Sequence, residues 1–450
     1  MNVSATIDET ECVSPLDGAF TFDEVRKAFE DCIRTKRNSL NAIEYTVDLT
    51  DKLTELWYEI NDGSYEIGTS ITFVVKIPVY REVFAADFRD RVVHHLVMNE
   101  LMPLFDAEFI DNSFSCRVGK GVMNGVSTME KELKKCSENY TKQVWALKMD
   151  VKSFFMSIDK ARLAKRVDLM IKERYPENRK KEKLRWLCEK IIMHHPEKNC
   201  KRKGDMEAWD FLPPHKSLFN VGDRFGLPIG NLTSQIFANF YMNPLDRFVT
   251  EELGSKHYGR YVDDFLIFST DKEKLRGAIR AIKWFVKEEI GVTVHPDKIF
   301  FQDASRGTKF IGGVLKYGRK YILDRTKGNL YYKLTHEFRH PSKAKVERLC
   351  MVVNSYLGFM RFYDSYRIRK EMFTKDRLLD EWVKTGLITV DKDFKKIMHP
   401  KKKTKVRKMG VFEFCNGSIT DDSEKHLNED VANTRIGKGK HKKRRYKKVV

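Results

Sequence analysis

The sequence predicts an α+β fold, in which helices pack on one face of a sheet, followed by a basic and disordered C-terminal tail. The first observation is the order of the elements: strand, helix, hairpin, helix and strand. The second is a hydrophobic fraction of 41% with 12% aromatic residues, which is typical of a globular chain. The third is uneven charge, because residues 395–450 hold 18 Lys and Arg against 6 Asp and Glu.

Hydrophobic periodicity places the elements of the first 200 residues. The segment ITFVVKIPVYREVFA (71–85) has the β-branched and aromatic content of strands. The run QVWALKMD (143–150) is mostly apolar up to its final aspartate, as in a buried strand. Apolar side chains at helical spacing predict two amphipathic helices within 20–60, and further helices over 88–104, 160–173 and 180–194.

The later elements follow from caps, turns and periodicity. Thr233 or Ser234 is the predicted cap of a helix that carries apolar residues through Tyr241. HYGRY (257–261) and FLIFS (265–269) flank Val-Asp-Asp, which predicts a tight hairpin. The remaining predictions are a helix over 275–286, strands over 310–316 and 320–324, and helices over 343–384.

Composition excludes some classes and favours others. No apolar run approaches the roughly 18 residues of a membrane span, and the acidic N-terminus predicts no secretory signal. The eight cysteines form no C-x-x-C pair, so we expect reduced thiols and a cytoplasmic protein. The 84 Lys and Arg exceed the 64 Asp and Glu by 20, which favours a polyanionic partner such as nucleic acid. The basic clusters at 401–408 and 438–448 are predicted RNA-binding or partner-docking arms, and simple solvation of the tail is the alternative.

Three aspartates form the candidate metal site. Asp150 ends a predicted strand, and Asp263 and Asp264 lie at the tip of the predicted hairpin. Carboxylates at neighbouring strand ends are suitable ligands for two Mg²⁺ ions, which activate a 3′-hydroxyl and stabilise departing pyrophosphate. Ordinary turn aspartates are the alternative, but acids directed toward one another are electrostatically costly unless a cation neutralises them.

Five segments occur in the order typical of reverse transcriptases and resemble the motifs of that family. They are LKMDVKSFF (147–155), GLPIGNLTSQ (226–235), GRYVDDFLIF (259–268), VTVHPDKIFF (292–301) and KFIGGVLK (309–316). Upstream, REVFAADFRDRVVHHL (81–96) and SFSCRVGKG (113–121) resemble fingers motifs of bacterial members. The resemblance covers residues 70–320. It implies a right-hand polymerase with fingers in 1–140 and 160–255, a palm in 141–159 and 256–318, a thumb in 319–395 and a tail in 396–450.

The motif Ile229-Gly230-x-x-x-Ser234-Gln235 is similar to that of reverse transcriptases from diversity-generating retroelements. That family implies copying of a template-repeat RNA into cDNA with frequent errors opposite adenine, after which the cDNA replaces a variable repeat in a target gene. The implied partners are that RNA, the cDNA or primer, deoxynucleotides and a small basic helical-bundle protein that forms a pentamer. The implied cofactor is a pair of Mg²⁺ ions, with Mn²⁺ as a substitute.

Residue roles at the metal site follow from the same resemblance. Asp150, Asp263 and Asp264 would hold the metals together with the carbonyl of Val151. Lys298 lies in the loop where related polymerases donate a proton to the leaving pyrophosphate.

The resemblance also implies the substrate contacts. Phe155 takes the steric-gate position, where an aromatic ring excludes a ribose 2′-hydroxyl. Lys76 and Arg81 would contact the incoming triphosphate and base, or else be solvated charges of a strand edge. Ile229 would line the pocket under the nascent pair, with a core role as the alternative. Gly230 would let the backbone approach the template, and Gln235 would contact nucleic acid.

Two further clusters were weighed. Arg117 and Lys120 stand beside Gly119 and Gly121 in a basic turn suited to phosphates. A zinc site is disfavoured because the C-x5-HH-x4-C spacing of residues 188–200 matches no common structural-zinc pattern.

The rival interpretations are retron or phage-defence reverse transcriptases, group II intron maturases and, from another class, a non-catalytic RNA-binding scaffold. The thumb region has no V-T-G triplet, which argues against a retron enzyme, and the last 56 residues lack a C-x-x-C…H-N-H arrangement, which argues against an intron-type endonuclease. A scaffold would have lost a carboxylate, and all three are present.

Overall fold

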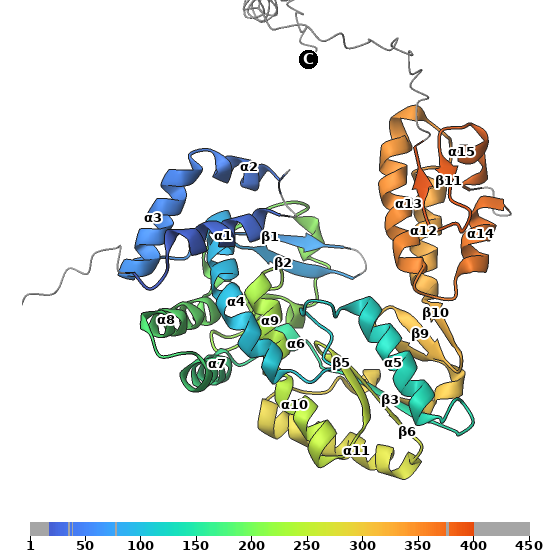
Figure 1. Ribbon diagram of the computed structural model, residues 1–450, viewed down its shortest axis with the longest axis horizontal. Helices are drawn as coiled ribbons and strands as arrows, with labels where there is room; N and C mark the ends of the chain where they lie inside the picture. Colours follow the sequence, from blue (N-terminus) through green and yellow to red (C-terminus); the bar gives the residue numbers. More distant parts are fainter. Residues whose placement is uncertain (1–17, 35–36, 38, 77–78, 375–377, 400–450) are drawn as a thin grey trace, which may run out of the picture. The chain divides into compact units, whose positions relative to one another are not determined.

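The computed structural model describes residues 18–34, 37, 39–76, 79–374 and 378–399 (Figure 1). The chain divides into two units, Met1–Pro400 and Lys401–Val450, and the described residues belong to the first. The predicted arms at 401–408 and 438–448, and the predicted disorder of the tail, lie outside the described residues.

A four-stranded antiparallel sheet forms the centre, with the strand order β5-β6-β3-β7. Its members are β3 (Trp145–Asp150), β5 (His257–Tyr261), β6 (Asp264–Ser269) and β7 (Phe300–Asp303). The predicted strand and hairpin are therefore confirmed. In the pairing of β3 with β6, Asp150 lies opposite Asp264, so two of the three aspartates meet at one end of the sheet.

Both faces of this sheet are buried, which corrects the expectation of helices on one face only. Leu147 and Ile267 belong to one buried cluster, whereas Ala146 and Phe268 belong to another. Neighbouring residues of a strand point to opposite faces, and here both faces are buried. The sequences of β3 and β6 are therefore mostly apolar rather than alternating. Figure 1 shows α5 (Val122–Cys136), which the sequence did not predict, lying over the strands.

The first face belongs to a large buried cluster that also contains residues of the helices before and after β3. These helices are α4 (Phe88–Glu108), α7 (Lys160–Arg174), α8 (Arg179–Met193), α9 (Leu232–Tyr241), α10 (Asn243–Arg247) and α11 (Lys272–Phe285). Helix α11 is capped by the Asp271 carboxylate and buries Leu275 and Ile282. Helix α9 begins after Asn231, whereas the sequence placed its cap at Thr233 or Ser234.

A second sheet joins segments far apart in the chain. The strand content predicted over 71–85 is confirmed: β1 (Ser70–Val75) and β2 (Arg81–Ala85) pair antiparallel, and β4 (Cys200–Arg202) pairs in parallel with β1. The N-terminal region holds three helices rather than the two predicted: α1 (Phe22–Ile33), α2 (Leu40–Thr46) and α3 (Leu49–Asp62).

The C-terminal part begins with a small sheet and continues as helices around Trp382, which is fully buried. The sheet contains β8 (Thr308–Phe310), β9 (Gly313–Lys316) and β10 (Arg319–Ile322). The helices are α12 (Asp324–His336), α13 (Val346–Met360), α14 (Tyr366–Thr374) and α15 (Asp380–Lys384), followed by β11 (Thr389–Val390) and β12 (Ile397–Met398). Helix α12 was not predicted, and β12 extends this part beyond the expected boundary at 395.

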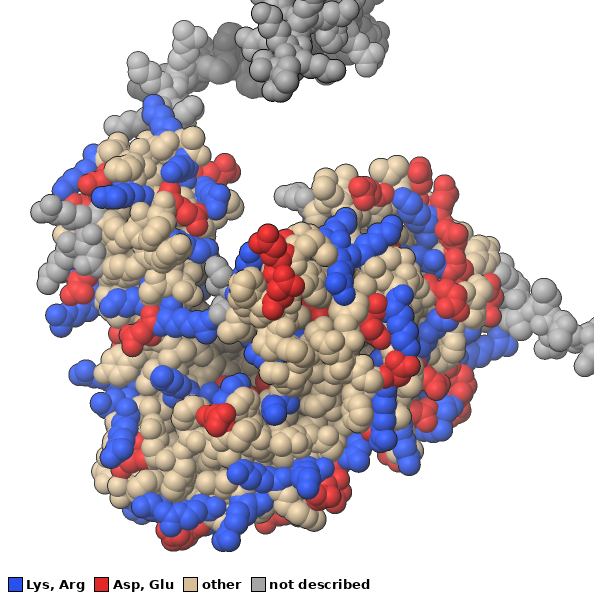
Figure 2. Space-filling model, turned by 180° about the vertical axis from the view of Figure 1, so that it is seen from behind, with Lys and Arg blue, Asp and Glu red and all other residues tan. Residues whose placement is uncertain are grey.

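Figure 2 shows Lys and Arg side chains distributed over the visible face and interspersed with acids. This distribution agrees with the modest excess in residues 1–394, where 66 Lys and Arg stand against 58 Asp and Glu. None of the helices in the described ranges combines the length and apolar character that crossing a bilayer requires.

Candidate active site

The central sheet brings the three predicted carboxylates to one end. Asp150 is the last residue of β3 and Asp264 is the first residue of β6. Asp263 occupies the two-residue turn between β5 and β6, since Tyr261 pairs directly with Asp264.

Two of these carboxylates, Asp263 and Asp264, have raised pKa values. Burial, reinforced by the charges of Asp150 and Asp264, raises the pKa of Asp263 to about 7. Burial also raises the pKa of Asp264 to about 6, although the charge of Lys148 opposes that rise. The Oδ1 atom of Asp264 is buried and has no hydrogen-bond partner. Clustered anionic oxygens with an unsatisfied buried atom are suited to a divalent cation, because such ions prefer oxygen ligands.

Two lysines contact this cluster. The Nζ atom of Lys298 lies 2.7 Å from Asp150 Oδ1, which places the predicted lysine directly at the site. The Nζ atom of Lys148 lies 3.1 Å from Asp264 Oδ2. The sequence interpretation missed Lys148, although its position two residues before Asp150 on the same strand places both side chains on one face.

The steric-gate candidate and the pocket candidate meet in a small cluster beside the sheet. Phe155, on the short helix α6 (Phe154–Ser157), and Ile229 both pack against a buried group that includes Phe84 and Leu218. The carbonyl of Phe155 accepts a hydrogen bond of 2.9 Å from the amide of Leu227. Val151, next to Asp150, is buried and forms a bridge with Val294.

Gly230 allows close packing within the chain. Its φ is +127°, and a Cβ there would lie 2.6 Å from the carbonyl oxygen of Phe84 in β2. The neighbouring Ile229 carbonyl accepts a hydrogen bond of 2.8 Å from the Phe84 amide. Close packing against β2 therefore explains why this position is a glycine, whereas its expected approach to a template stays a prediction.

Lys76 and Arg81 lie at the same end of the β1–β2 hairpin. Arg81 is exposed and pairs in register with Val75, the residue before Lys76. Lys76 forms an ion pair with Asp205. The contacts described for these two residues do not include the carboxylates, so their substrate role stays a prediction.

Acidic side chains of the protein itself pair with both cations of the predicted phosphate-binding turn. Arg117 is only 7% exposed at its side chain and donates to Asp106 Oδ1 at 2.5 Å and to the carbonyls of Ile110 and Ser113. Lys120 donates to Asp111 Oδ1 at 2.5 Å. The Arg117 guanidinium thus stabilises the turn that leads into α5, and its contact with nucleic acid stays a prediction.

Gln235 is exposed on α9, and its Oε1 lies 3.5 Å from the Cys116 thiol. The amide is thus accessible at the surface, and its contact with nucleic acid stays a prediction.

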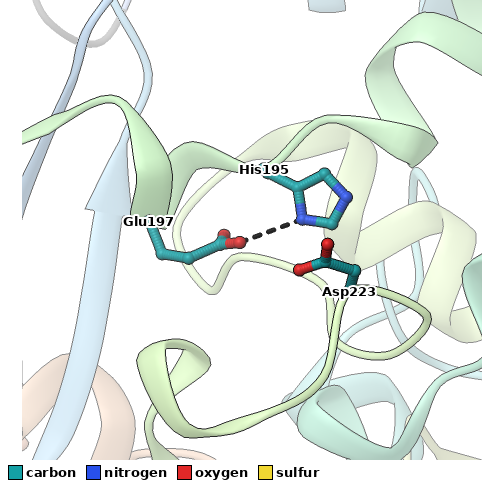
Figure 3. Close-up of side chains that lie close together, drawn as sticks. All are labelled: His195, Glu197 and Asp223. Atoms are coloured by element: carbon teal, nitrogen blue, oxygen red, sulfur yellow. Dashed lines mark hydrogen bonds and ion pairs between the residues drawn. The ribbon is translucent and has the colours of Figure 1, made fainter.

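A separate cluster lies near β4, where His195 stands beside Glu197 and Asp223 (Figure 3). One possible metal-ligand atom from each of these three residues lies within 4.8 Å of the other two. Among the residues that the structure describes, the oxygens of Asp150, Asp263 and Asp264 do not lie as close together. Two lysines already supply positive charge here, since Lys160 Nζ lies 3.3 Å from His195 Nδ1 and Lys198 donates to Asp223 at 2.7 Å. The cluster ties α7 to the loop at 221–226 and carries no metal assignment.

Comparisons with known structures give distant matches. The apo telomerase of Candida tropicalis matches with 14% identity and a TM-score of 0.43, covering 76% of this chain and 62% of that one. The Candida albicans telomerase, solved with the TWJ fragment of telomeric RNA, matches with 10% identity and a TM-score of 0.38, covering 71% and 59%. This chain thus spans less than two thirds of either telomerase chain. A search of curated proteins gives no match.

The family comparison is more informative. The model for reverse transcriptase (RNA-dependent DNA polymerase) matches residues 78–315, which is 238 of the 450 residues. The matched segment contains the central sheet, all three aspartates and both lysines that contact them. The chain therefore belongs to the reverse transcriptase family.

Proposed function

We propose that this protein is an RNA-directed DNA polymerase that extends a primer along an RNA template. The observation that carries the proposal is the meeting of Asp150, Asp263 and Asp264 at one end of the sheet, with an unsatisfied buried oxygen on Asp264. The fingers, palm and thumb boundaries given above belong to the same proposal, with the end of the thumb moved to residue 399.

Asp150, Asp263, Asp264 and the Val151 carbonyl would hold two Mg²⁺ ions, for which Mn²⁺ would substitute. Bound there, the metal pair supplies activation of the primer 3′-hydroxyl and charge stabilisation of the leaving pyrophosphate. Lys298 forms an ion pair with Asp150. In the proposed reaction it would leave this partner and donate a proton to the departing pyrophosphate. Lys148 would hold the orientation of the Asp264 carboxylate through its ion pair with Oδ2.

Substrate selection would depend on the cluster that Phe155 and Ile229 share. The Phe155 ring would exclude a ribose 2′-hydroxyl by occupying its space. Lys76 and Arg81 would reach the triphosphate, and for Lys76 this requires exchange of its partner Asp205 for a phosphate. Gln235 and Lys120 would contact the template strand.

Primer extension on a defined RNA template tests the activity. Asp263→Asn and Asp264→Asn should each abolish cDNA synthesis because they remove charge from the metal site, while RNA binding stays within about threefold. Glu273→Gln is the matched control, since Glu273 is an exposed acid on α11 that forms an ion pair with Arg276 on the same helix. Robust extension by both aspartate variants would refute the assignment.

Within this activity, we infer a role in diversity-generating retrohoming: error-prone copying of a template-repeat RNA, assisted by a basic pentameric partner. The support is the Ile229-Gly230-x-x-x-Ser234-Gln235 motif, which places an aliphatic side chain where many reverse transcriptases have glutamine. Ile229 offers the nascent pair only dispersion, so a mismatched pair loses little relative to a correct one.

Ile229→Gln should therefore raise fidelity. The resemblance to diversity-generating retroelement enzymes, rather than the chemistry of Ile229, makes template adenine the base expected to respond most. One hydrogen bond contributes about 0.5–1.5 kcal/mol, which corresponds to a change in error rate of roughly twofold to 13-fold. Sequencing cDNA made by wild type and variant on one template, with equal nucleotide concentrations, measures this. An equal or higher adenine error rate in an active Ile229→Gln enzyme would remove this residue from the account of infidelity.

A further inference from the structure

The turn that carries Asp263 has an unfavourable backbone conformation. Val262 and Asp263 form a two-residue loop between the paired residues Tyr261 and Asp264. Val262 has φ +57°, although it is β-branched and occupies a hairpin position where glycine is favoured. Such a conformation persists only where the surrounding structure holds it.

The group that holds this turn is a buried arginine two residues earlier. Arg260 is 0% exposed, and its Nη1 donates to the carbonyl oxygen of Val262 at 2.9 Å and to Asn239 Oδ1 at 2.8 Å. Its Nε and Nη2 bind both carboxylate oxygens of Asp246, at 2.6 and 2.5 Å. Nη2 also lies 3.4 Å from Ser113 Oγ.

These partners come from three separate segments. Asp246 lies on α10, Asn239 on α9 and Ser113 on the turn before α5. Two of these partners are themselves fixed: Asp246 accepts a hydrogen bond of 2.7 Å from the Tyr258 hydroxyl, and the Ser113 carbonyl accepts one from Arg117. The arginine therefore joins the Val262 carbonyl to side chains of α9, α10 and the turn before α5.

We propose that Arg260 is a positioning residue for the metal-binding carboxylates: it fixes the Val262 carbonyl, and thereby the direction in which Asp263 and Asp264 present their oxygens. The proposal rests on the proposed function, because that function makes these aspartates metal ligands. The planar guanidinium is suited to this task, since it donates along several fixed directions at once.

A contribution to stability alone does not account for this arrangement. A buried ion pair is weak evidence for stability, because apolar residues of similar volume often serve as well. The Asp246 pair uses Nε and Nη2, which leaves Nη1 directed at Asn239 and the strained turn. The hydrogen bond from Nη1 to the Val262 carbonyl links these anchored partners to the turn that carries Asp263.

Substitution by lysine tests the proposal, because Arg260→Lys keeps the charge opposite Asp246 but cannot make all these bonds. We expect the full-length variant to bind Mn²⁺, measured by electron paramagnetic resonance of the free ion, about tenfold more weakly than wild type. The Mg²⁺ concentration for half-maximal primer extension should rise by a similar factor, while RNA affinity stays within about threefold.

A second substitution separates positioning from stability. Val262→Gly adopts positive φ without being held, so in the Arg260→Lys background it should restore most of the lost Mn²⁺ affinity. Arg369→Lys is the matched control. Arg369 is 4% exposed and donates to the carbonyls of Asp393 and Phe394, and Phe394 also has positive φ, at 55°. Its loss should lower the melting temperature without changing Mn²⁺ affinity.

The proposal is overturned if folded Arg260→Lys binds Mn²⁺ as wild type does, or if Val262→Gly restores nothing. Should Arg260→Lys fail to fold, Asn239→Ala removes one anchor of Nη1 and should weaken Mn²⁺ binding about threefold; unchanged affinity in that variant would equally overturn the proposal. A wild-type protein that binds Mn²⁺ but extends no primer would contradict the polymerase activity, and its Mn²⁺ affinity would still decide the role of Arg260.

Discussion

Asp263 and Asp264 lower the stability of the fold when they are ionised, because burial raises their pKa values. The pKa of Asp263 is raised to about 7 from its ordinary value of 3.8, and that of Asp264 to about 6. A carboxyl group with a raised pKa in the folded state contributes stability below pH 3.8, and that contribution is lost as the pH rises through the folded-state pKa. The ionised pair therefore lowers the free energy of unfolding at neutral pH.

Asp263→Asn and Asp264→Asn should accordingly stabilise the metal-free protein. We expect a gain on the order of 1–3 kcal/mol in the free energy of unfolding at pH 8, and a smaller gain at pH 5, where the folded wild-type groups are largely protonated. Thermal unfolding with EDTA at both pH values measures it. Mg²⁺ should then raise the melting temperature of wild type more than that of either variant. A loss of stability at pH 8 would contradict the prediction.

The Phe155 ring is expected to decide which sugar enters. Phe155→Ala should open the space under C2′ and raise ribonucleotide incorporation by about tenfold or more. Phe155→Tyr keeps the ring and serves as the control. The measurement is the ratio of ribonucleotide to deoxynucleotide use on one template. A ratio that does not move would show that Phe155 is only a packing residue.

At the scale of elements, the site depends on how the segment before α9 lies against β2. The Ile229 carbonyl and the Phe84 amide are hydrogen-bonded, and Gly230 passes close to the Phe84 carbonyl. This contact brings Ile229 to the cluster that contains Phe155. A change in the segment would therefore move Ile229, the residue proposed to line the nucleotide pocket.

Gly230→Ala should displace this segment from β2, because the new Cβ would meet backbone at 2.6 Å and φ is +127°. We expect a loss of about 1–3 kcal/mol in stability and of most activity. Gly328→Ala is the control: a Cβ there meets nothing within 4 Å in helix α12, so it should raise stability by up to about 1 kcal/mol. Equal melting temperatures for both variants would refute the strain argument.

Part of this arrangement follows from the sequence and part does not. Asp150, Asp263 and Asp264 were predictable because apolar strands end at them, and strand ends meet at a sheet edge. The role of Arg117 was not predictable, because a cation beside glycines does not reveal the acid that neutralises it, which lies eleven residues earlier on α4. Arg260 was equally hidden, since its partners lie on separate segments that only the fold brings together.

At the scale of the whole chain, charge is divided between a nearly balanced body and a basic C-terminal segment. Of the net charge of +20, residues 395–450 account for 18 − 6 = +12. The boundary for separating the two lies after Pro400, because Ile397 is buried in the helical C-terminal part and its amide donates to Asn354.

Deleting residues 401–450 should weaken RNA or partner binding and reduce its salt dependence, because phosphate contacts release counterions. Extension of short primers should survive, since the carboxylate end of the sheet is untouched. Binding measured between 50 mM and 300 mM salt, for full-length and shortened chains, decides it. Identical salt slopes for the two chains would show that the segment only solubilises the protein.

The parallel pairing of β4 with β1 has a consequence for the order of synthesis. Ser70 pairs with Cys200, so β1 leaves the ribosome about 130 residues before its neighbour on that side. At roughly 5–20 residues per second, this interval lasts about 6–26 s. During that time β1 has only β2 beside it, and its other edge presents unpaired backbone groups that invite pairing with another chain. Until residue 202 emerges, this open edge of β1 is therefore a place where the nascent protein can misassemble.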